Sequence, residues 1–353
     1  METAERALIE RLWFPVARSE DLAEDRPMAG RVLDRDLVIF RTPQGPVIAD
    51  DRCPHRGAAL SMGGLVAGEL ECGYHGWRYR GADGRCTHVP SLPGGAPPRV
   101  SLTTRRAAER YGFVWGCLGE PFLELPTVEP LERGAWQVAR GLPHDLRCGY
   151  RQLTENFRDT SHFPFVHRGT MGPNVKREVP RYQVGRNRWT LQWTIPTDLG
   201  GTAFGGNRDL AAAQTLAYTV VLPSVALVHT TFPDGGQRIT LQLATPIDGD
   251  GARCRQFWAV AIDPIAARHS ETALADQFDY ERRIFEEDWP IIESQTPPEA
   301  PLDAGDQAHT RADQFSLVYR KTYLELMSLR DRRPRGPAAR ALRSARLRAR
   351  ASR

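Results

Sequence analysis

Two short loops near the amino end of the chain constrain its fold more than any other feature of the sequence. The first contains Cys53 and His55, the second contains Cys72 and His75, and sixteen residues separate His55 from Cys72. Each loop therefore offers one thiolate and one imidazole. Glycine and proline residues in both loops permit tight turns, so four side chains that are distant in sequence can converge on one centre.

Two kinds of metal centre use two cysteines and two histidines. A structural zinc site usually groups cysteine with cysteine and histidine with histidine. A [2Fe–2S] cluster of mixed ligation instead places both sulfurs on one iron and both imidazoles on the other. Because each loop carries one residue of each type, the pattern favours the cluster over zinc.

The residues after the second loop extend this pattern. Gly76-Trp77, Asp83-Gly84-Arg85-Cys86 and Pro90 follow at short intervals, and together with the loops they resemble the Rieske domain of Rieske non-haem iron oxygenases. The resemblance implies an all-β Rieske domain, which we place at residues 1–124. It also implies that the [2Fe–2S] cluster is bound by Cys53, His55, Cys72 and His75.

The amino acids of this first domain favour β-strands. Residues 12–17, 46–49 and 111–116 are rich in β-branched and aromatic side chains. Residues 30–41 have the same character but are interrupted at 34–36, which predicts a hairpin turn there. The strands agree with an all-β domain.

A second group of potential metal ligands lies between residues 156 and 167. His162 and His167 are five residues apart, so on an ideal helix their side chains point about 140° apart. Pro164 lies between them and predicts a kink or a helix end that can turn both rings toward one point. Two imidazoles and one carboxylate form a facial triad, the ligand set suited to Fe(II) that keeps open positions.

The carboxylate of such a triad must come from elsewhere in the chain. Residues 274–292 have the periodicity of an amphipathic helix, and Asp288 falls within its apolar stripe. An ionised carboxylate on a buried face is costly unless it is paired or binds a metal. We therefore expect Asp288 to be the third ligand. Glu287 is the alternative, because Pro290 can kink the helix and rotate its faces.

The spacing of Asn156, Asp159, His162 and His167 also resembles the iron-binding segment of the same oxygenase family. The resemblance implies that the two histidines bind a catalytic iron. It further implies that Asp159 links His162 to a cluster histidine, His75, of a neighbouring subunit. Asn156 is a candidate catalytic residue, with a helix cap or a core hydrogen bond as the alternative, and Asp159 has a plain surface acid as its alternative.

The rest of the chain predicts an α+β domain at residues 125–329. Helices are expected before and after a run of strands, which argues for an antiparallel sheet with packed helices. The family resemblance implies that this is a helix-grip-like catalytic domain. No GxGxxG fingerprint indicates a dinucleotide-binding domain. The strands are expected at 189–195, 216–222, 226–232, 239–244 and 257–262.

The carboxyl-terminal segment 330–353 differs from the rest in composition. It contains ten arginines and one acidic residue, and without it the chain has more acidic than basic residues. We predict a solvated, disordered tail. The alternative is contact with nucleic acid, an acidic partner or a membrane.

The amino-acid composition indicates the cellular compartment of the protein. With 41% hydrophobic and 25% charged residues, the chain resembles soluble globular proteins. No apolar run approaches the roughly 20 residues of a membrane span, and the start lacks the apolar core of a secretory signal. We expect a cytoplasmic protein without membrane or nucleic-acid partners. An even number of cysteines can indicate disulfides, but nothing else in the sequence suggests secretion.

The family resemblance implies an enzyme that uses O2 and electrons from a separate NAD(P)H-dependent reductase, with or without a ferredoxin. It would hydroxylate or oxidatively demethylate an aromatic or hydrophobic small molecule. The length of the chain and its compact histidine motif (Asn156, Asp159, His162 and His167) resemble the vanillate and dicamba O-demethylase branch. The family resemblance also implies a homotrimer. The alternatives are an aromatic-ring cis-dihydroxylating dioxygenase alpha subunit, a Rieske electron-transfer protein without oxygenase activity, and a zinc-stabilised binding module.

Overall fold

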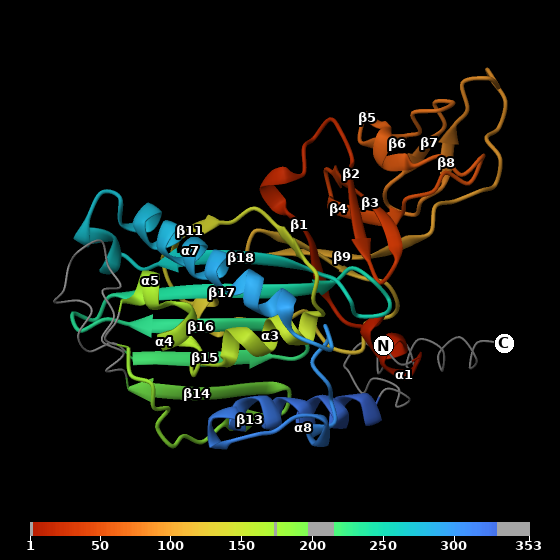
Figure 1. Cartoon of the computed structure of the whole chain (residues 1–353). Helices are drawn as coiled ribbons and strands as arrows, with labels where there is room; N and C mark the ends of the chain where they lie inside the picture. Colours follow the sequence, from red (N-terminus) through yellow and green to blue (C-terminus); the bar gives the residue numbers. More distant parts are fainter. Residues whose placement is uncertain (1–2, 173–174, 197–214, 330–353) are drawn as a thin grey trace, which may run out of the picture.

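The computed structural model describes residues 3–172, 175–196 and 215–329, and Figure 1 shows their arrangement. The arginine-rich segment 330–353 lies outside the described residues, so its predicted disorder stays a prediction. None of the helices in the described ranges is both long enough and apolar enough to span a membrane.

A six-stranded antiparallel sheet forms the body of the first domain, in the order β1-β10-β9-β4-β3-β2. All the strands predicted in this part of the sequence are present. Their bounds are β1 Phe14–Arg18, β2 Met28–Val32, β3 Arg35–Thr42, β4 Gly45–Asp50, β9 Thr104–Arg110 and β10 Phe113–Cys117.

A second, smaller sheet carries the two Cys/His loops. It contains four short antiparallel strands in the order β5-β6-β7-β8 and projects from the six-stranded sheet at the upper right of Figure 1. One loop precedes the sheet and the other connects β6 to β7. The bounds are β5 Gly64–Val66, β6 Glu69–Glu71, β7 Arg78–Arg80 and β8 Cys86–His88.

The hairpin between β2 and β3 turns slightly earlier than predicted. Val32 pairs with Arg35, which leaves Leu33 and Asp34 as a two-residue turn. Both residues have positive φ, 51° and 63°, as a type I′ turn requires. The sequence favoured a turn at 34–36 because those residues are charged, but Arg35 and Asp36 belong to the strand.

The second domain is built on an eight-stranded sheet whose paired strands run antiparallel. The main order is β11-β18-β17-β16-β15-β14-β13, and β12 also pairs with β18. The five predicted strands of this region are confirmed. The bounds are β11 Gln137–Arg140, β12 His144–Leu146, β13 Gly185–Asn187, β14 Thr190–Pro196, β15 Thr215–Val221, β16 Val225–Thr231, β17 Gln237–Pro246 and β18 Cys254–Ile262.

Both faces of this sheet are covered, and the alternation along β17 shows how. Its odd-numbered residues, such as Leu241, pack in one apolar cluster with Phe113 and Trp115 of the first domain. Its even-numbered residues face the helices, since the side-chain amide of Gln242 donates to the carbonyl oxygen of Leu153 at 3.1 Å. The two domains therefore share a core, and the other face of the sheet is left for the helices.

Helices α3 and α7 lie across that free face, as Figure 1 shows, and position the histidine motif and Asp288. The long helix α7 confirms the helix predicted at 274–292. Thus an all-β domain precedes a sheet-and-helix domain, as expected. The bounds are α1 Thr3–Ile9, α2 Glu129–Glu132, α3 Tyr150–Arg158, α4 Phe163–Val166, α5 Arg168–Met171, α7 Ala273–Ser294 and α8 Gln314–Ser328.

Candidate metal centres

The two Cys/His loops close in the same way. The backbone N–H of Gly57 donates to the carbonyl oxygen of Cys53 at 2.8 Å, and that of Gly76 donates to Cys72 at 2.9 Å. Both glycines have left-handed φ angles, +74° and +68°, which a side chain would disfavour. Each cysteine is therefore presented at the start of a matching tight turn.

The four side chains of these loops are arranged with the sulfurs inside and the imidazoles outside. Cys53 and Cys72 are each 2% exposed, whereas His55 is half-buried and His75 is exposed. The two imidazole centroids lie 4.8 Å apart. The hydroxyl of Tyr79 lies 3.1 Å from the sulfur of Cys53. Two buried sulfurs and two outward imidazoles fit a cluster of mixed ligation.

A second centre forms where three ligand atoms meet. The Nε2 atoms of His162 and His167 lie 3.1 Å apart. Asp288 Oδ1 lies 3.4 Å from the first and 3.2 Å from the second. This oxygen is buried and has no hydrogen-bond partner within the described part of the chain. An orphaned carboxylate oxygen beside two converging nitrogens fits a divalent metal held on one face.

The outer nitrogen of each imidazole has a carboxylate as its hydrogen-bond partner. His162 Nδ1 lies 2.9 Å from Asp159 Oδ2, and His167 Nδ1 lies 2.9 Å from Glu287 Oε2. Thr170 donates its hydroxyl to the other oxygen of Glu287 at 2.7 Å. Carboxylates on the outer nitrogens fix the tautomer and the direction in which Nε2 points. Glu287 therefore lies behind a histidine, and Asp288 lies among the converging atoms.

Charged groups of opposite sign meet within this site. Burial acts to lower the pKa of His162, but the carboxylates of Asp159 and Asp288 raise it to about 9. Burial likewise acts to raise the pKa of Asp288, but the two imidazoles hold it at about 2. A proton on His162 thus supplies part of the positive charge that a bound metal ion would supply.

The helix ends earlier than the kink or helix end that was predicted at Pro164. Helix α3 ends at Arg158, six residues before Pro164, which instead lies in the first turn of α4. The intervening turn is closed by Asp159, whose Oδ1 accepts from the N–H of Ser161 at 2.9 Å. Short polar side chains compete for backbone donors in this way, so the break comes at Asp159. The two imidazoles converge because the chain bends there.

A small cavity opens beside the three converging atoms. Its free volume is about 60 Å³ between the described residues, which is room for about two waters. An aromatic ligand therefore has to displace side chains. Asn156 lines this cavity, together with Phe157, Phe163, Met171, Leu216, Tyr218, Val228, Arg238, Thr240, Tyr280, Glu281, Ile284 and Phe285.

Comparisons with known proteins identify the family of the chain. The family model described as the Rieske [2Fe–2S] domain matches residues 12–103. The model described as the vanillate O-demethylase oxygenase C-terminal domain matches residues 146–328, more than half of the chain. The chain belongs to the Rieske non-haem iron oxygenases. It is thus an oxidoreductase with a Rieske [2Fe–2S] domain, as its sequence indicated.

Named relatives of this oxygenase include demethylases. It is 27% identical over 333 residues to methylxanthine N1-demethylase NdmA from Pseudomonas putida, covering 91% of this chain and 90% of the relative. It is 36% identical over 162 residues to the dicamba O-demethylase oxygenase component of Stenotrophomonas maltophilia, covering 44% and 47%. The structure of Pseudomonas putida NdmA with caffeine matches with a TM-score of 0.80 at 26% identity, covering 93% of each chain.

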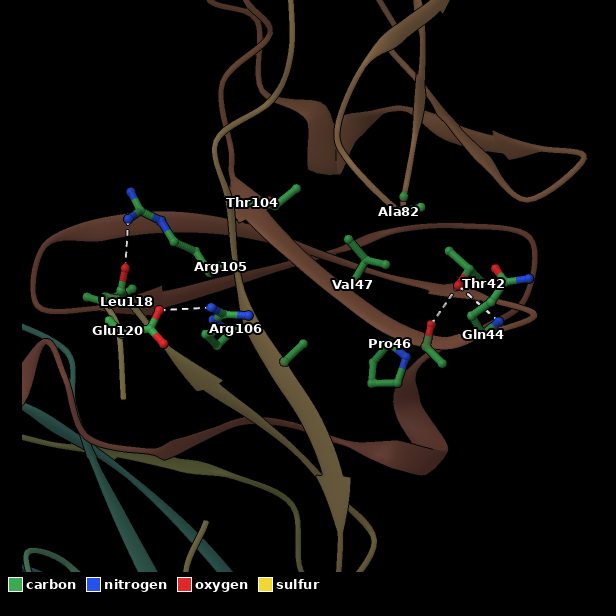
Figure 2. Close-up of a pocket in the computed structure, with 14 residues that line it drawn as sticks. Thr42, Gln44, Pro46, Val47, Ala82, Thr104, Arg105, Arg106, Leu118 and Glu120 are labelled. Carbon is green, nitrogen blue, oxygen red and sulfur yellow. Dashed lines mark hydrogen bonds and ion pairs between the residues drawn. The ribbon is translucent and has the colours of Figure 1, made fainter. Parts of the chain in front are cut away.

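A larger hollow of about 580 Å³ lies on the Rieske domain of the oxygenase, away from both centres. Figure 2 shows that its charged side chains are already paired: Arg105 donates to the carbonyl oxygen of Leu118 at 2.8 Å, and Arg106 pairs with Glu120. None of its lining residues belongs to the candidate ligands. We therefore assign it no part in the chemistry of the oxygenase.

Sequence reasoning missed several residues around the second centre of the oxygenase. It considered Glu287 only as a ligand, and it did not single out Glu281, which lies seven residues before Asp288. That spacing places the two acids about 20° apart on the helical wheel, so the same argument that selected Asp288 could have found Glu281. Arg238 carried no signal, because its partner is distant in sequence.

Proposed function

We propose that this oxygenase hydroxylates or demethylates a small aromatic substrate at an iron bound by His162, His167 and Asp288. One observation carries the proposal, namely the convergence of two Nε2 atoms and one orphaned carboxylate oxygen within 3.4 Å. When bound there, ferrous iron would supply the activation of O2. His162, His167 and Asp288 all line the small cavity, so a ligand in that cavity would contact the metal site.

The surrounding residues hold the ligands ready. Asp159 and Glu287 each accept a hydrogen bond from an outer imidazole N–H, which keeps the proton on Nδ1 and leaves the Nε2 lone pair for the metal. Because both acids are themselves held, by Ser161 and Thr170 respectively, the imidazoles cannot rotate freely. Asn156 is placed at the cavity wall, where it can contact substrate.

The first centre would supply electrons. We propose that Cys53, His55, Cys72 and His75 bind the Rieske cluster, which accepts one electron at a time from a separate reductase. The exposure of His75 supports an electron path through the imidazole side. A short stretch of the chain is also 40% identical over 111 residues to oxidoreductase NdmD of Pseudomonas putida, covering 19% of that protein.

The assembly we propose is a homotrimer in which Asp159 of one subunit meets His75 of the next. Figure 1 shows the loop-bearing sheet β5–β8 far from helices α4 and α5, so the two centres of one chain are widely separated. A neighbouring subunit would shorten the path. The reductase acts with or without a ferredoxin. The buried cysteines outside the two cluster loops form no disulfide, which fits a reducing cytoplasm.

The substrate class follows from the relatives and the cavity. Relatives are named as demethylases of methylxanthine, dicamba and vanillate, all methylated aromatic compounds. The cavity wall here is mainly aromatic and aliphatic. Hydroxylating a methyl carbon attached to O or N gives a product that loses formaldehyde, so demethylation and hydroxylation are one activity on two kinds of substrate.

The test is reconstitution of turnover. The purified chain, a reductase and NADH are supplied with methoxy- and N-methyl-aromatic compounds, while O2 uptake and formaldehyde are recorded. The proposal expects substrate-dependent O2 uptake with equal amounts of formaldehyde and demethylated product. A diol detected by mass spectrometry would instead indicate ring dihydroxylation. Reduction of the cluster without any substrate-dependent O2 uptake would leave only electron transfer.

A further inference from the structure

A buried ion pair faces the same cavity as the candidate iron ligands. Arg238 lies on β17 and is 6% exposed, and Glu281 lies on α7 and is 7% exposed. Arg238 Nη1 lies 3.8 Å from Glu281 Oε2 and donates to Gln277 Oε1 at 2.8 Å. Arg238 and Glu281 both line the cavity, beside Thr240. None of these side chains belongs to the proposed metal site.

The distance between the ion pair and the proposed metal site is suited to an aromatic ring that reaches from one to the other. Glu281 and Asp288 are seven residues apart on α7, so they share one face and are separated by about 10 Å along the helix axis. The wall between them is apolar and includes Ile284 and Phe285. A planar ring that displaces side chains of this small cavity and contacts the wall can therefore present one end to the metal ligands and the other end to the ion pair.

Holding the sheet and the helix together does not by itself explain why this pair is charged. Replacing a buried ion pair with well-packed apolar residues is often neutral or stabilising, because both charges lose their hydration. The guanidinium is instead oriented in advance, since Gln277 accepts from Nη1 and the ring of Tyr280 lies 5.5 Å from the guanidinium carbon. An oriented donor beside an acceptor at a cavity wall is suited to ligand recognition.

We propose that Arg238 and Glu281 anchor the substrate, and that the substrate is a neutral aromatic compound carrying an amide-like edge. Its carbonyl oxygen accepts from Arg238, and its adjacent N–H donates to Glu281. One cation beside one anion favours a neutral ligand, because a charged one would leave an uncompensated charge in a buried site. The opposite end of the ring presents its methyl group to the metal site. This inference rests on the proposed function.

Binding to the iron-loaded, cluster-containing protein under argon tests the anchor directly. The probes are para-methoxybenzamide, para-methoxybenzoate and para-methylanisole, which share one ring and one methoxy group, and calorimetry gives each dissociation constant. Para-methoxybenzamide is expected to bind at least about tenfold more tightly than either other probe. Equal affinities, tighter binding of the benzoate, or no binding of the benzamide would each overturn the proposal.

Two variants test the contributions of Glu281 and Arg238 one at a time. Glu281→Gln removes the anion, so the ratio of benzoate to benzamide affinity should rise by about tenfold or more. Arg238→Gln should weaken benzamide binding by about tenfold while changing para-methylanisole binding little. The matched controls are Glu286→Gln and Arg282→Gln, two exposed residues that pair with each other on the same helix. Ratios that do not move relative to these controls would contradict the anchor.

Turnover distinguishes the two proposals. If reductase and O2 yield formaldehyde from para-methoxybenzamide but the variants do not change the probe preference, the anchor is wrong and the oxygenase reaction stands. If the preference and its shifts are observed but no substrate-dependent O2 uptake occurs, the anchor stands and the proposed reaction is wrong. Circular dichroism and iron content verify that each variant is folded and loaded.

Discussion

At the scale of single residues, two adjacent acids on α7 have different positions. Asp288 is 5% exposed and its Oδ1 lies among the Nε2 atoms of the two histidines. Glu287 lies behind His167 and contacts only the outer nitrogen of that ring. One step along a helix turns the side chain by about 100°, so only one of the two can face the centre. Asp288 is the better candidate ligand for this reason.

Exchanging each acid for its amide tests this difference. Asp288→Asn should lose the iron of the second centre while keeping the cluster, because the charged oxygen at the converging point is gone. Glu287→Gln should keep that iron with an affinity loss of about tenfold or less, since the amide oxygen still accepts from His167. Iron content is measured after dialysis, with exposed Glu286→Gln as the control. Iron lost in Glu287→Gln and kept in Asp288→Asn would reverse the assignment.

Metal binding at this centre should depend on pH. In the metal-free chain the pKa of His162 is about 9 and that of Asp288 is about 2. At neutral pH a metal ion must displace the proton of His162, so affinity should rise about tenfold per pH unit up to about pH 9 and then level off. Fe(II) titration of iron-depleted protein measures this rise. Asp159→Asn removes a carboxylate that raises the pKa, so its plateau should begin at lower pH; a flat profile in the wild type would contradict the account.

At the scale of elements, helix α7 delivers Asp288 by packing against the sheet. Phe285 is 2% exposed, and its ring centroid lies 5.2 Å from that of Trp258 on β18 and 6.3 Å from that of Phe157 on α3. The aromatic contacts thus join the helix to both the sheet and the histidine-bearing segment. The position of the carboxylate depends on this packing, because Asp288 lies one turn further along.

Removing the ring of Phe285 should loosen this junction. Phe285→Ala leaves a buried cavity and should destabilise the second domain by about 3–5 kcal/mol. Affinity for the second iron should fall as well, because α7 holds Asp288 less firmly. Denaturant unfolding and iron titration measure the two effects. The control is Glu286→Ala at the neighbouring exposed position, and a midpoint unchanged relative to this control would show that the packing is not needed.

Much of this element structure was predictable from sequence. Alternation and β-branched residues predicted the strands, and the apolar stripe predicted α7 and put Asp288 on its buried face. The helix break at Asp159 was not predicted, because it depends on a side chain capturing the backbone of Ser161 rather than on the proline. The facing of Arg238 and Glu281 also could not be predicted, since it requires knowing how α7 lies on β17.

At the scale of the whole molecule, the two centres lie in different parts of one chain. The loop-bearing sheet projects from the first domain, and the histidine motif lies under α7 in the second (Figure 1). The domains share an apolar core, and the hydroxyl of Thr245 on β17 donates to the carbonyl oxygen of Pro15 on β1 at 2.6 Å. A rigid connection of this kind keeps the two centres apart, so electrons should cross between subunits.

Mixed assemblies test this crossing. Cys72→Ser should abolish the cluster and Asp288→Asn the second iron, so each variant alone should be inactive. In a randomly mixed ring, about a quarter of the interfaces join an intact cluster to an intact iron, and about that fraction of wild-type turnover should return. Size-exclusion chromatography of co-expressed, doubly tagged protein confirms mixing. Mixed assemblies that stay inactive would favour transfer within one chain.

We expect this chain to hold one iron in addition to the cluster. The most direct measurement is the ratio of iron to acid-labile sulfide in anaerobically purified wild-type protein. We expect about three irons and two sulfides per chain, with one iron fewer in His162→Ala and the sulfide unchanged. Wild-type protein with only two irons for two sulfides after loading with Fe(II), or with zinc in place of iron, would contradict it.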